Sequence, residues 1–120
     1  MSVRAAILLI SLCVSALADF AAGRRAFEKG DYATALKEYL PLAKQGDALA
    51  QIALGFMYHD GKGVAQDYKE ASRWYRLAAE QGDAVAQSAL GSMYVRGVGV
   101  TQDDKEASMW YRLAALRRRW

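Results

Sequence analysis

A segment of 36 residues occurs twice in succession, and this duplication constrains the fold more than any other feature of the sequence. Residues 46–81 and 82–117 align without a gap and are identical at about 25 positions, including the run Trp-Tyr-Arg-Leu-Ala-Ala at 74–79 and again at 110–115. Tandem units of this length are typical of proteins whose small supersecondary units stack on one another and share a continuous core. The sequence therefore predicts a stacked repeat.

Each unit is predicted to form two helices. Its apolar residues recur at steps of three and four, as Ala50, Leu54 and Met57 do in the first half and Ala71 and Tyr75 in the second. This spacing places them on one face of a helix, and the alternation expected of a strand is absent.

Turn and cap residues mark where these helices begin and end. Asp67 followed by Glu70 resembles a capping box at the start of the second helix, where carboxylates accept hydrogen bonds from unpaired amides. Gly61 and Gly63 are expected to end the first helix and turn the chain. All four residues recur 36 positions later, as Asp103, Glu106, Gly97 and Gly99.

Gly55 and its copy Gly91 lie inside the first helix, where glycine costs about 1 kcal/mol relative to alanine. Their recurrence predicts a close approach of two helices, at which a Cβ atom does not fit. Ala71 and Ala107 are the small residues expected to face them.

A diverged hairpin is predicted before the two units, over residues 19–45. Asp31, Ala35 and Tyr39 each lie 36 positions before an identical residue, so the second helix of this hairpin keeps the phase of the repeat. A tight Gly30-Asp31 turn replaces the loop with two glycines. The expected order is thus residues 19–45, 46–81 and 82–117, followed by a basic tail at 118–120.

The pattern that carries a family resemblance is G-D-A-x-A-Q-x-A-L-G-x-M-Y-x-x-G-x-G-V, followed by D-x-K-E-A-S-x-W-Y-R-L-A-A. It resembles the Sel1-like repeat, a longer-looped relative of the tetratricopeptide repeat, whereas residues 30–35 are closer to a tetratricopeptide half-unit. The resemblance implies an all-α fold, a short α-solenoid of about three antiparallel helical hairpins. It also implies a concave face, lined by the first helix of each hairpin, that contacts other proteins. It implies no shared chemistry, because a fold does not fix function.

The first 18 residues are predicted to be a signal peptide. Arg4 supplies a positive charge, residues 5–18 form an uncharged and largely apolar run, and Ala16-Leu17-Ala18 offers small residues for cleavage after Ala18. An uncleaved anchor is the weaker alternative, because a membrane-spanning helix needs about 20 apolar residues. We therefore expect a periplasmic or secreted protein.

Composition argues against several kinds of site. Cys13 is the only cysteine and lies in the predicted signal peptide, so the mature chain would have no thiol for a disulfide, a metal or a nucleophile. The formal net charge of +3 reflects a near balance of acids and bases and gives no argument for nucleic-acid binding. No cofactor or metal is predicted.

A partner-binding surface is predicted where the two copies differ. Positions that packing requires should match between the copies, whereas positions that meet a partner are free to differ. At about 100° per residue, the differing positions of the two first helices fall within an arc of roughly 100°. We call them the variable stripe, which consists of Leu49, Ile52, Phe56, His59, Asp60, Val85, Ser88, Ser92, Val95 and Arg96.

The variable stripe has two interpretations. As a groove, its apolar end and Arg96 would suit an extended or helical segment of another protein with an apolar anchor and a negative group. Alternatively, Ile52 and Phe56 pack on the first hairpin around Phe27 while the serines face solvent, because apolar residues usually belong to the core.

The function expected from these features is that of an exported scaffold or adaptor, and not of an enzyme. One alternative is a cell-envelope enzyme of β-lactamase-like type, an activity that the resemblance implies for some cysteine-rich members. His59 beside Asp60 is the sole histidine, and we recognise no accompanying nucleophile at a suitable spacing.

The C-terminal repeat offers two further possibilities. Self-association is an alternative because Trp110 and Leu113 would lack a following hairpin to cover them. The residues at the end, Arg117, Arg118, Arg119 and Trp120, are expected to cap a helix and keep it soluble, with weak contact to an anionic membrane surface as the alternative.

Overall fold

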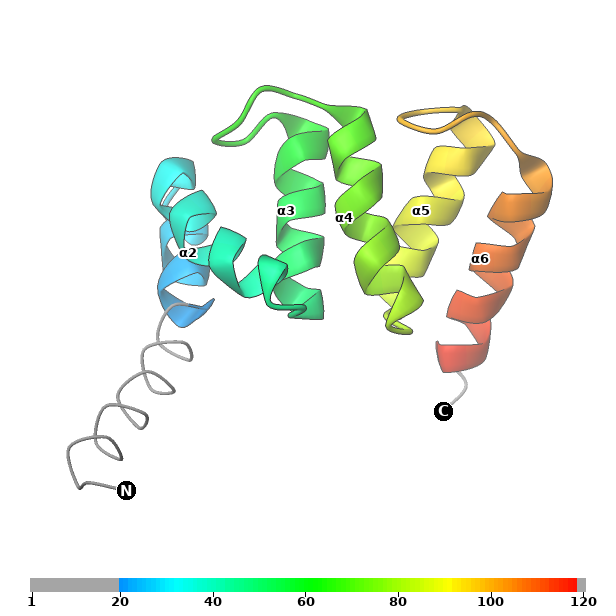
Figure 1. The fold of residues 1–120 in the computed structure, drawn as a ribbon, viewed down its shortest axis with the longest axis horizontal. Coiled ribbons are helices and arrows are strands. Elements are labelled where there is room, and N and C mark those ends of the chain that lie inside the picture. The colour runs from blue at the N-terminus through cyan, green and yellow to red at the C-terminus, as the bar shows by residue number, and fades with distance from the viewer. Residues whose placement is uncertain (1–19, 119–120) are drawn as a thin grey trace, which may run out of the picture.

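The computed structural model describes residues 20–118, which form helices and connecting turns only. A helix over residues 20–28 is followed by α2 (Tyr32–Lys44), α3 (Ala48–Asp60), α4 (Tyr68–Glu80), α5 (Ala84–Arg96) and α6 (Asp104–Arg118). Consecutive helices pack side by side in alternating directions and form one row (Figure 1). The predicted all-α fold of three hairpins is confirmed. The predicted signal peptide, residues 1–18, lies outside the described residues, as do Arg119 and Trp120.

Aspartates cap the second helices as the sequence predicts. Asp67 Oδ1 accepts a hydrogen bond from the backbone N–H of Glu70 at 3.0 Å, and Asp103 Oδ1 accepts one from Glu106 at 3.2 Å. The reciprocal half of the capping box takes another form, because the backbone N–H of Asp67 donates to the Tyr58 carbonyl at 2.9 Å. The start of α4 is therefore tied to the end of α3, and the loop between them is closed.

Glycines end the first helices in the left-handed conformation. Gly61 has φ 68° and Gly97 has φ 65°, and their backbone N–H groups donate to the carbonyls of Met57 and Met93. Glycine takes this conformation without a steric penalty, so the chain turns sharply at both positions.

A Cβ atom does not fit at Gly55, as predicted, but what meets it is the side-chain ring of Tyr75 in α4 and not Ala71. A Cβ atom built on Gly55 would lie 2.8 Å from Tyr75 Cε1. The expectation of a small residue was wrong because the space left by the missing Cβ is filled by an aromatic ring of the neighbouring helix and not by a closer approach of the two backbones.

The same pairing of a glycine with a tyrosine ring occurs in the other two hairpins. A Cβ atom on Gly91 would lie 3.2 Å from the Tyr111 ring, and one on Gly23 would lie 2.9 Å from Tyr39 Cε1. Gly23 is thus the structural equivalent of Gly55 and Gly91, which shows that the diverged first hairpin is built on the same plan.

The core has two parts. One joins the N-terminal helix, α2 and α3 around Tyr39, Leu42, Leu54 and Met57. The other joins α4, α5 and α6 around Tyr75, Leu90, Met93 and Trp110.

A glutamine bridges each junction between hairpins. Gln51 Nε2 donates to the Ala43 carbonyl at 3.1 Å, and Gln87 Nε2 donates to the Ala79 carbonyl at 3.1 Å. Identical hydrogen bonds thus hold the consecutive hairpins at the same register, which is what a solenoid requires.

Candidate protein-binding groove

Two adjoining hollows form one groove across the first helices of the three hairpins. The first encloses about 390 Å³ and is lined by apolar and aromatic side chains: Phe27, Tyr39, Ile52, Ala53, Phe56, Tyr75, Val85 and Ala89. The second encloses about 280 Å³, shares Phe56, Tyr75 and Ala89, and adds His59, Asp60, Ser92, Met93 and Arg96. We call these residues together the groove.

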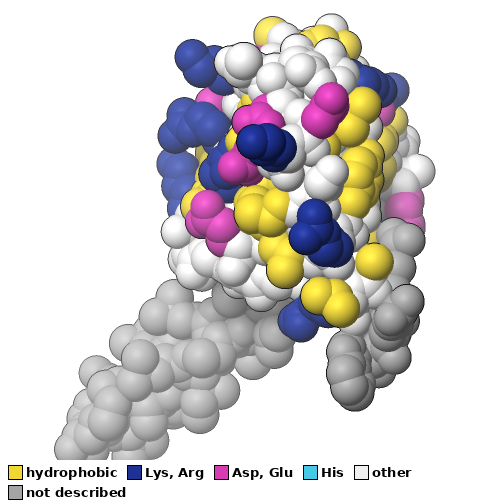
Figure 2. Space-filling model, turned by 90° about the vertical axis from the view of Figure 1, so that its right-hand side faces the viewer, with side chains coloured by type: hydrophobic (Ala, Val, Ile, Leu, Met, Phe, Trp, Pro, Cys, Tyr) yellow, Lys and Arg dark blue, Asp and Glu magenta, His cyan; other side chains and the backbone are white. Residues whose placement is uncertain are grey.

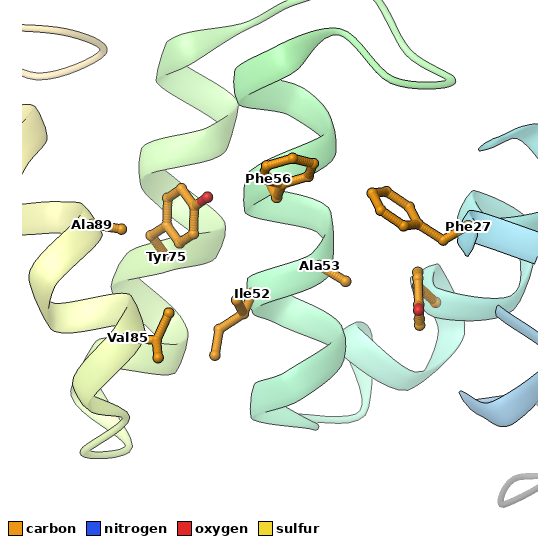
Figure 3. A pocket seen from close by; sticks show the side chains of 8 residues that line it. Phe27, Ile52, Ala53, Phe56, Tyr75, Val85 and Ala89 are labelled. Atoms are coloured by element: carbon orange, nitrogen blue, oxygen red, sulfur yellow. The ribbon is translucent and has the colours of Figure 1, made fainter. Parts of the chain in front are cut away.

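The apolar end of the groove is built around aromatic rings. The rings of Phe27 and Phe56 meet edge to face, with centroids 5.7 Å apart and planes inclined at 67°. Figure 3 shows this pair on one side of the groove, Val85 and Ala89 on the other, and Tyr75 of α4 between them. Phe56 nevertheless remains 41% exposed, so part of its side chain is accessible to a ligand.

The polar end of the groove carries charges of both signs. His59 Nδ1 lies 2.8 Å from Asp60 Oδ1, and the His59 ring contacts the Tyr68 ring with centroids 5.1 Å apart. No ion pair among residues 20–118 includes Arg96, which lines the opposite wall from α5. A carboxylate entering from solvent could therefore approach Arg96 directly.

Tyr75 joins the two ends. Its side chain is only 7% exposed, and burial, assisted by the Asp60 carboxylate, raises the pKa of its phenol to about 12. A tyrosine phenol is neutral at physiological pH even with its ordinary pKa of about 10, and this one can offer a hydrogen bond at the boundary between the apolar and polar ends.

Seven of the ten residues of the variable stripe lie in the groove: Ile52, Phe56, His59, Asp60, Val85, Ser92 and Arg96. Leu49, Ser88 and Val95 do not line it. Leu49 lies in the first turn of α3 and is 59% exposed. Ser88 and Val95 lie on the edge of α5 that is turned away from α3, as their angular positions on the helix require.

The two interpretations of the stripe describe different residues of one surface. Phe56 does contact Phe27, as the packing alternative predicts, and Ile52 packs against the second core cluster. Both residues still line the accessible groove. The contact with the first hairpin therefore shapes the groove and does not close it.

Comparison of the repeats missed several groove residues because they are identical in the two copies. Tyr75 is repeated as Tyr111, Ala53 as Ala89, and Met93 repeats Met57, so none of these positions belongs to the variable stripe. A ring that covers a glycine on one face can still line a groove with its edge. The glycine in the middle of a helix was the available signal for that ring.

Arg117, at the predicted basic end, lies against its own repeat. Its guanidinium carbon would be 3.2 Å from a Cβ atom on Gly82. The equivalent residue 36 positions earlier, Gln81, donates to the Gly46 carbonyl and to Gln51 Oε1, both at 2.9 Å. Arg117 thus occupies the place of Gln81. The side chain of Arg118, and the whole of Arg119 and Trp120, lie outside the described residues.

The described residues show no arrangement that favours the envelope-enzyme alternative. No group of three or more His, Cys, Asp or Glu side chains between residues 20 and 118 is placed to hold a metal ion. None of the helices in this range combines the length and the apolar character needed to cross a membrane.

Comparisons with known proteins identify the repeats. A profile of the Sel1 repeat matches residues 48–83 and 84–117, more than half of the chain. The crystal structure of c5321, described as a protective antigen of uropathogenic Escherichia coli strains with an SLR fold, is 40% identical with a TM-score of 0.81, and the match covers 85% of this chain and 23% of that one. A Sel1 repeat protein from Oxalobacter formigenes is 36% identical with a TM-score of 0.76, covering 79% and 39% of the two chains.

The chain spans well under half the length of either of these proteins. No curated protein was found to match it. The Sel1 fold is generally a protein-interaction module and typically a scaffold without catalytic activity. The repeat profile, the solved structures and the stacked hairpins agree, and this chain belongs to the Sel1 repeat family.

Proposed function

We propose that the chain is an exported adaptor or scaffold that holds a segment of a partner protein in the groove. The observation that carries this proposal is the coincidence of two independent features. The positions at which the repeats differ, and which packing therefore does not fix, supply seven residues of the groove.

The composition of the groove defines the segment that it suits. The apolar end has space for one or two aliphatic or aromatic side chains, and burying such a side chain contributes about 1.5–3 kcal/mol. At the polar end, Arg96 suits a carboxylate, because a charge-assisted hydrogen bond to a guanidinium is stronger than a neutral one. A helical or extended segment with an apolar anchor and an acidic residue one or two turns away satisfies both ends.

A site-specific crosslinking experiment tests the groove. A photoreactive amino acid replaces Phe56 in one version of the chain and Val95 in another, and both are produced in cells that make the protein naturally. Both positions are exposed on first helices, but only Phe56 lines the groove. We expect a discrete adduct from position 56 and none from position 95.

Variants of the groove then establish that the adduct reflects recognition. Phe56→Ala and Arg96→Ala should each weaken binding of the crosslinked partner about tenfold or more, corresponding to about 1.4 kcal/mol. Far-UV circular dichroism should show unchanged helical content. Unfolding of Phe56→Ala would assign the residue to packing, and equal adducts from positions 56 and 95 would contradict the proposal.

Export rests on the sequence of residues 1–18 and is tested separately. Mass spectrometry of the protein from its native cells should show a chain that begins at Asp19, recovered from the envelope or the medium. Recovery of the intact chain from the cytoplasm would contradict export and leave the groove proposal standing.

A further inference from the structure

The last helix exposes a face that the equivalent helix of the preceding repeat buries. Tyr75 of α4 is 7% exposed, whereas its copy Tyr111 in α6 is 42% exposed, although each ring covers the glycine of its own hairpin. The same contrast holds for two more identical pairs, since Ser72 and Ala79 are buried and Ser108 and Ala115 are exposed. The difference therefore arises outside the hairpin.

Helix α5 of the following hairpin is what covers this face of α4. Gln87 Nε2 donates to the Ala79 carbonyl at 3.1 Å. Ser72 Oγ, which donates to the Lys69 carbonyl of its own helix at 2.7 Å, also lies 3.4 Å from the carbonyl oxygen of Gly99, in the loop after α5. The Arg76 guanidinium donates to the Tyr94 hydroxyl and lies over that ring, 5.6 Å from its centroid. One helix and its loop thus engage a serine, an arginine and an alanine of α4.

The polar members of this face are not needed to build a hairpin. In α2 the positions of Ser72 and Arg76 are occupied by Leu36 and Leu40, and that hairpin still docks on α3 through Gln51 and the Ala43 carbonyl. Helix α6 nevertheless keeps Ser108, Tyr111, Arg112 and Ala115, all of them exposed. On the same helix, Met109 has replaced the equivalent Arg73, so the copies have diverged elsewhere.

We propose that Ser108, Tyr111, Arg112 and Ala115 of α6 form a docking surface for the first helix of a further Sel1-like hairpin. Figure 2 looks onto this end of the molecule, where hydrophobic side chains lie among charged ones. The docking helix carries a glutamine that donates to the Ala115 carbonyl and a tyrosine that meets Arg112, and the loop after it presents a glycine carbonyl to Ser108.

A second copy of this chain does not supply that helix. Its N-terminal helix is the only first helix not already packed between two others in the described residues. When Gly23 is aligned with Gly55 and Gly91, Arg25 of the N-terminal helix occupies the position at which Met57 and Met93 are buried in the other two hairpins. A charge at that position opposes head-to-tail stacking, which would otherwise produce open filaments.

The test is a chain extended by a third copy of residues 82–117 in place of residues 118–120. If α6 accepts an α5-type helix, the extended chain should unfold in one transition at a melting temperature at least about 5 °C above that of the parent, because each stacking interface adds stability to a solenoid. Melting at the temperature of the parent, or in two separate transitions, would overturn the proposal.

Ala115→Glu provides the matched control. In the parent chain this substitution alters an exposed position and should shift the melting temperature by no more than about 2–4 °C. In the extended chain it should abolish most of the rise in melting temperature that the third repeat gives. Ala79→Glu in the parent, at the equivalent position with 2% exposure, should unfold the protein. Equal effects of Ala115→Glu in the two chains would refute docking at this face. The proposal would also be refuted if the parent chain forms a dimer in sedimentation and Ala115→Glu dissociates that dimer, since this result would assign the face to a second copy.

Discussion

Replacing Gly55 by alanine sets helix propensity against packing, and the structure decides which effect is larger. The helix would gain about 1 kcal/mol, because alanine is the better helix former. The new Cβ would lie 2.8, 2.9 and 3.0 Å from three carbons of the Tyr75 ring, whereas carbon atoms in favourable contact lie about 3.5 Å or more apart. Either the ring or the helix must therefore move by about half an ångström or more.

Tyr75 cannot yield easily, because it is 7% exposed and enclosed between α3 and α5. Overpacking of a core costs about 1–3 kcal/mol, and an overlap with three atoms of a confined ring belongs in the upper half of that range. After the gain in propensity, Gly55→Ala should lower the free energy of unfolding by about 1–2 kcal/mol, which lowers the melting temperature by about 4–16 °C for a domain of this size.

Gly91→Ala is the matched control, since it makes the same change in the same context of sequence. Its Cβ would lie 3.2 Å from the Tyr111 ring, and that ring is 42% exposed and can move toward solvent. The gain in propensity should then dominate, so that this variant is unchanged or up to about 1 kcal/mol more stable. Thermal and urea unfolding followed by circular dichroism measure both variants. A loss of stability in Gly91→Ala equal to that in Gly55→Ala would refute the reasoning.

Three further predictions concern stability. Gly99→Ala should cost about 3 kcal/mol or more in urea unfolding, because it combines a left-handed φ of 73° with a Cβ that would overlap the backbone oxygen of Tyr68 in α4. Gly30→Ala, at φ 81° with nothing within 4 Å, should cost only about 1–2 kcal/mol. Similar losses in the two variants would count against the backbone clash. Gln87 Oε1 is buried and has no hydrogen-bond partner, whereas the equivalent Gln51 Oε1 accepts a hydrogen bond from the Gln81 side chain. Arg117→Gln should supply the missing donor to Gln87 and therefore maintain or raise the melting temperature. A marked fall would disprove this pairing. The pKa of Tyr75 is raised to about 12 from about 10 in the unfolded chain. The contribution of the neutral phenol to stability is therefore complete below about pH 10 and is lost as the pH rises toward about 12. Tyr75→Phe should lose less stability than the parent between these pH values, and an equal loss would contradict the assignment.

Local features of the sequence determined the elements of the fold. The spacing of Leu54 and Met57, the caps at Asp67 and Asp103 and the left-handed glycines at 61 and 97 act within one or two turns of chain, so their consequences follow without knowledge of the tertiary structure. The period of 36 residues then fixed the order of the hairpins, because identical units bury their apolar faces only by stacking in one register.

Sequence differences between the repeats located about half of the groove residues, because a position that packing does not fix is free to change. Difference between the copies and position in the groove do not coincide fully, for a physical reason. Ser88 and Val95 differ between the copies, yet they lie on the outer edge of α5 with no first helix beyond them among the described residues. Tyr75 is identical in the copies, yet its edge lines the groove while its face covers Gly55.

The sequence by itself determined that this protein is a stack of helical hairpins of the Sel1 type, and the positions at which its repeats are free to vary. Only the tertiary structure decided that a tyrosine and not an alanine faces each hairpin glycine, and that identical residues are buried in α4 and exposed in α6. Burial depends on which neighbour covers a face, and the two repeats are nearly identical in sequence but have different neighbours.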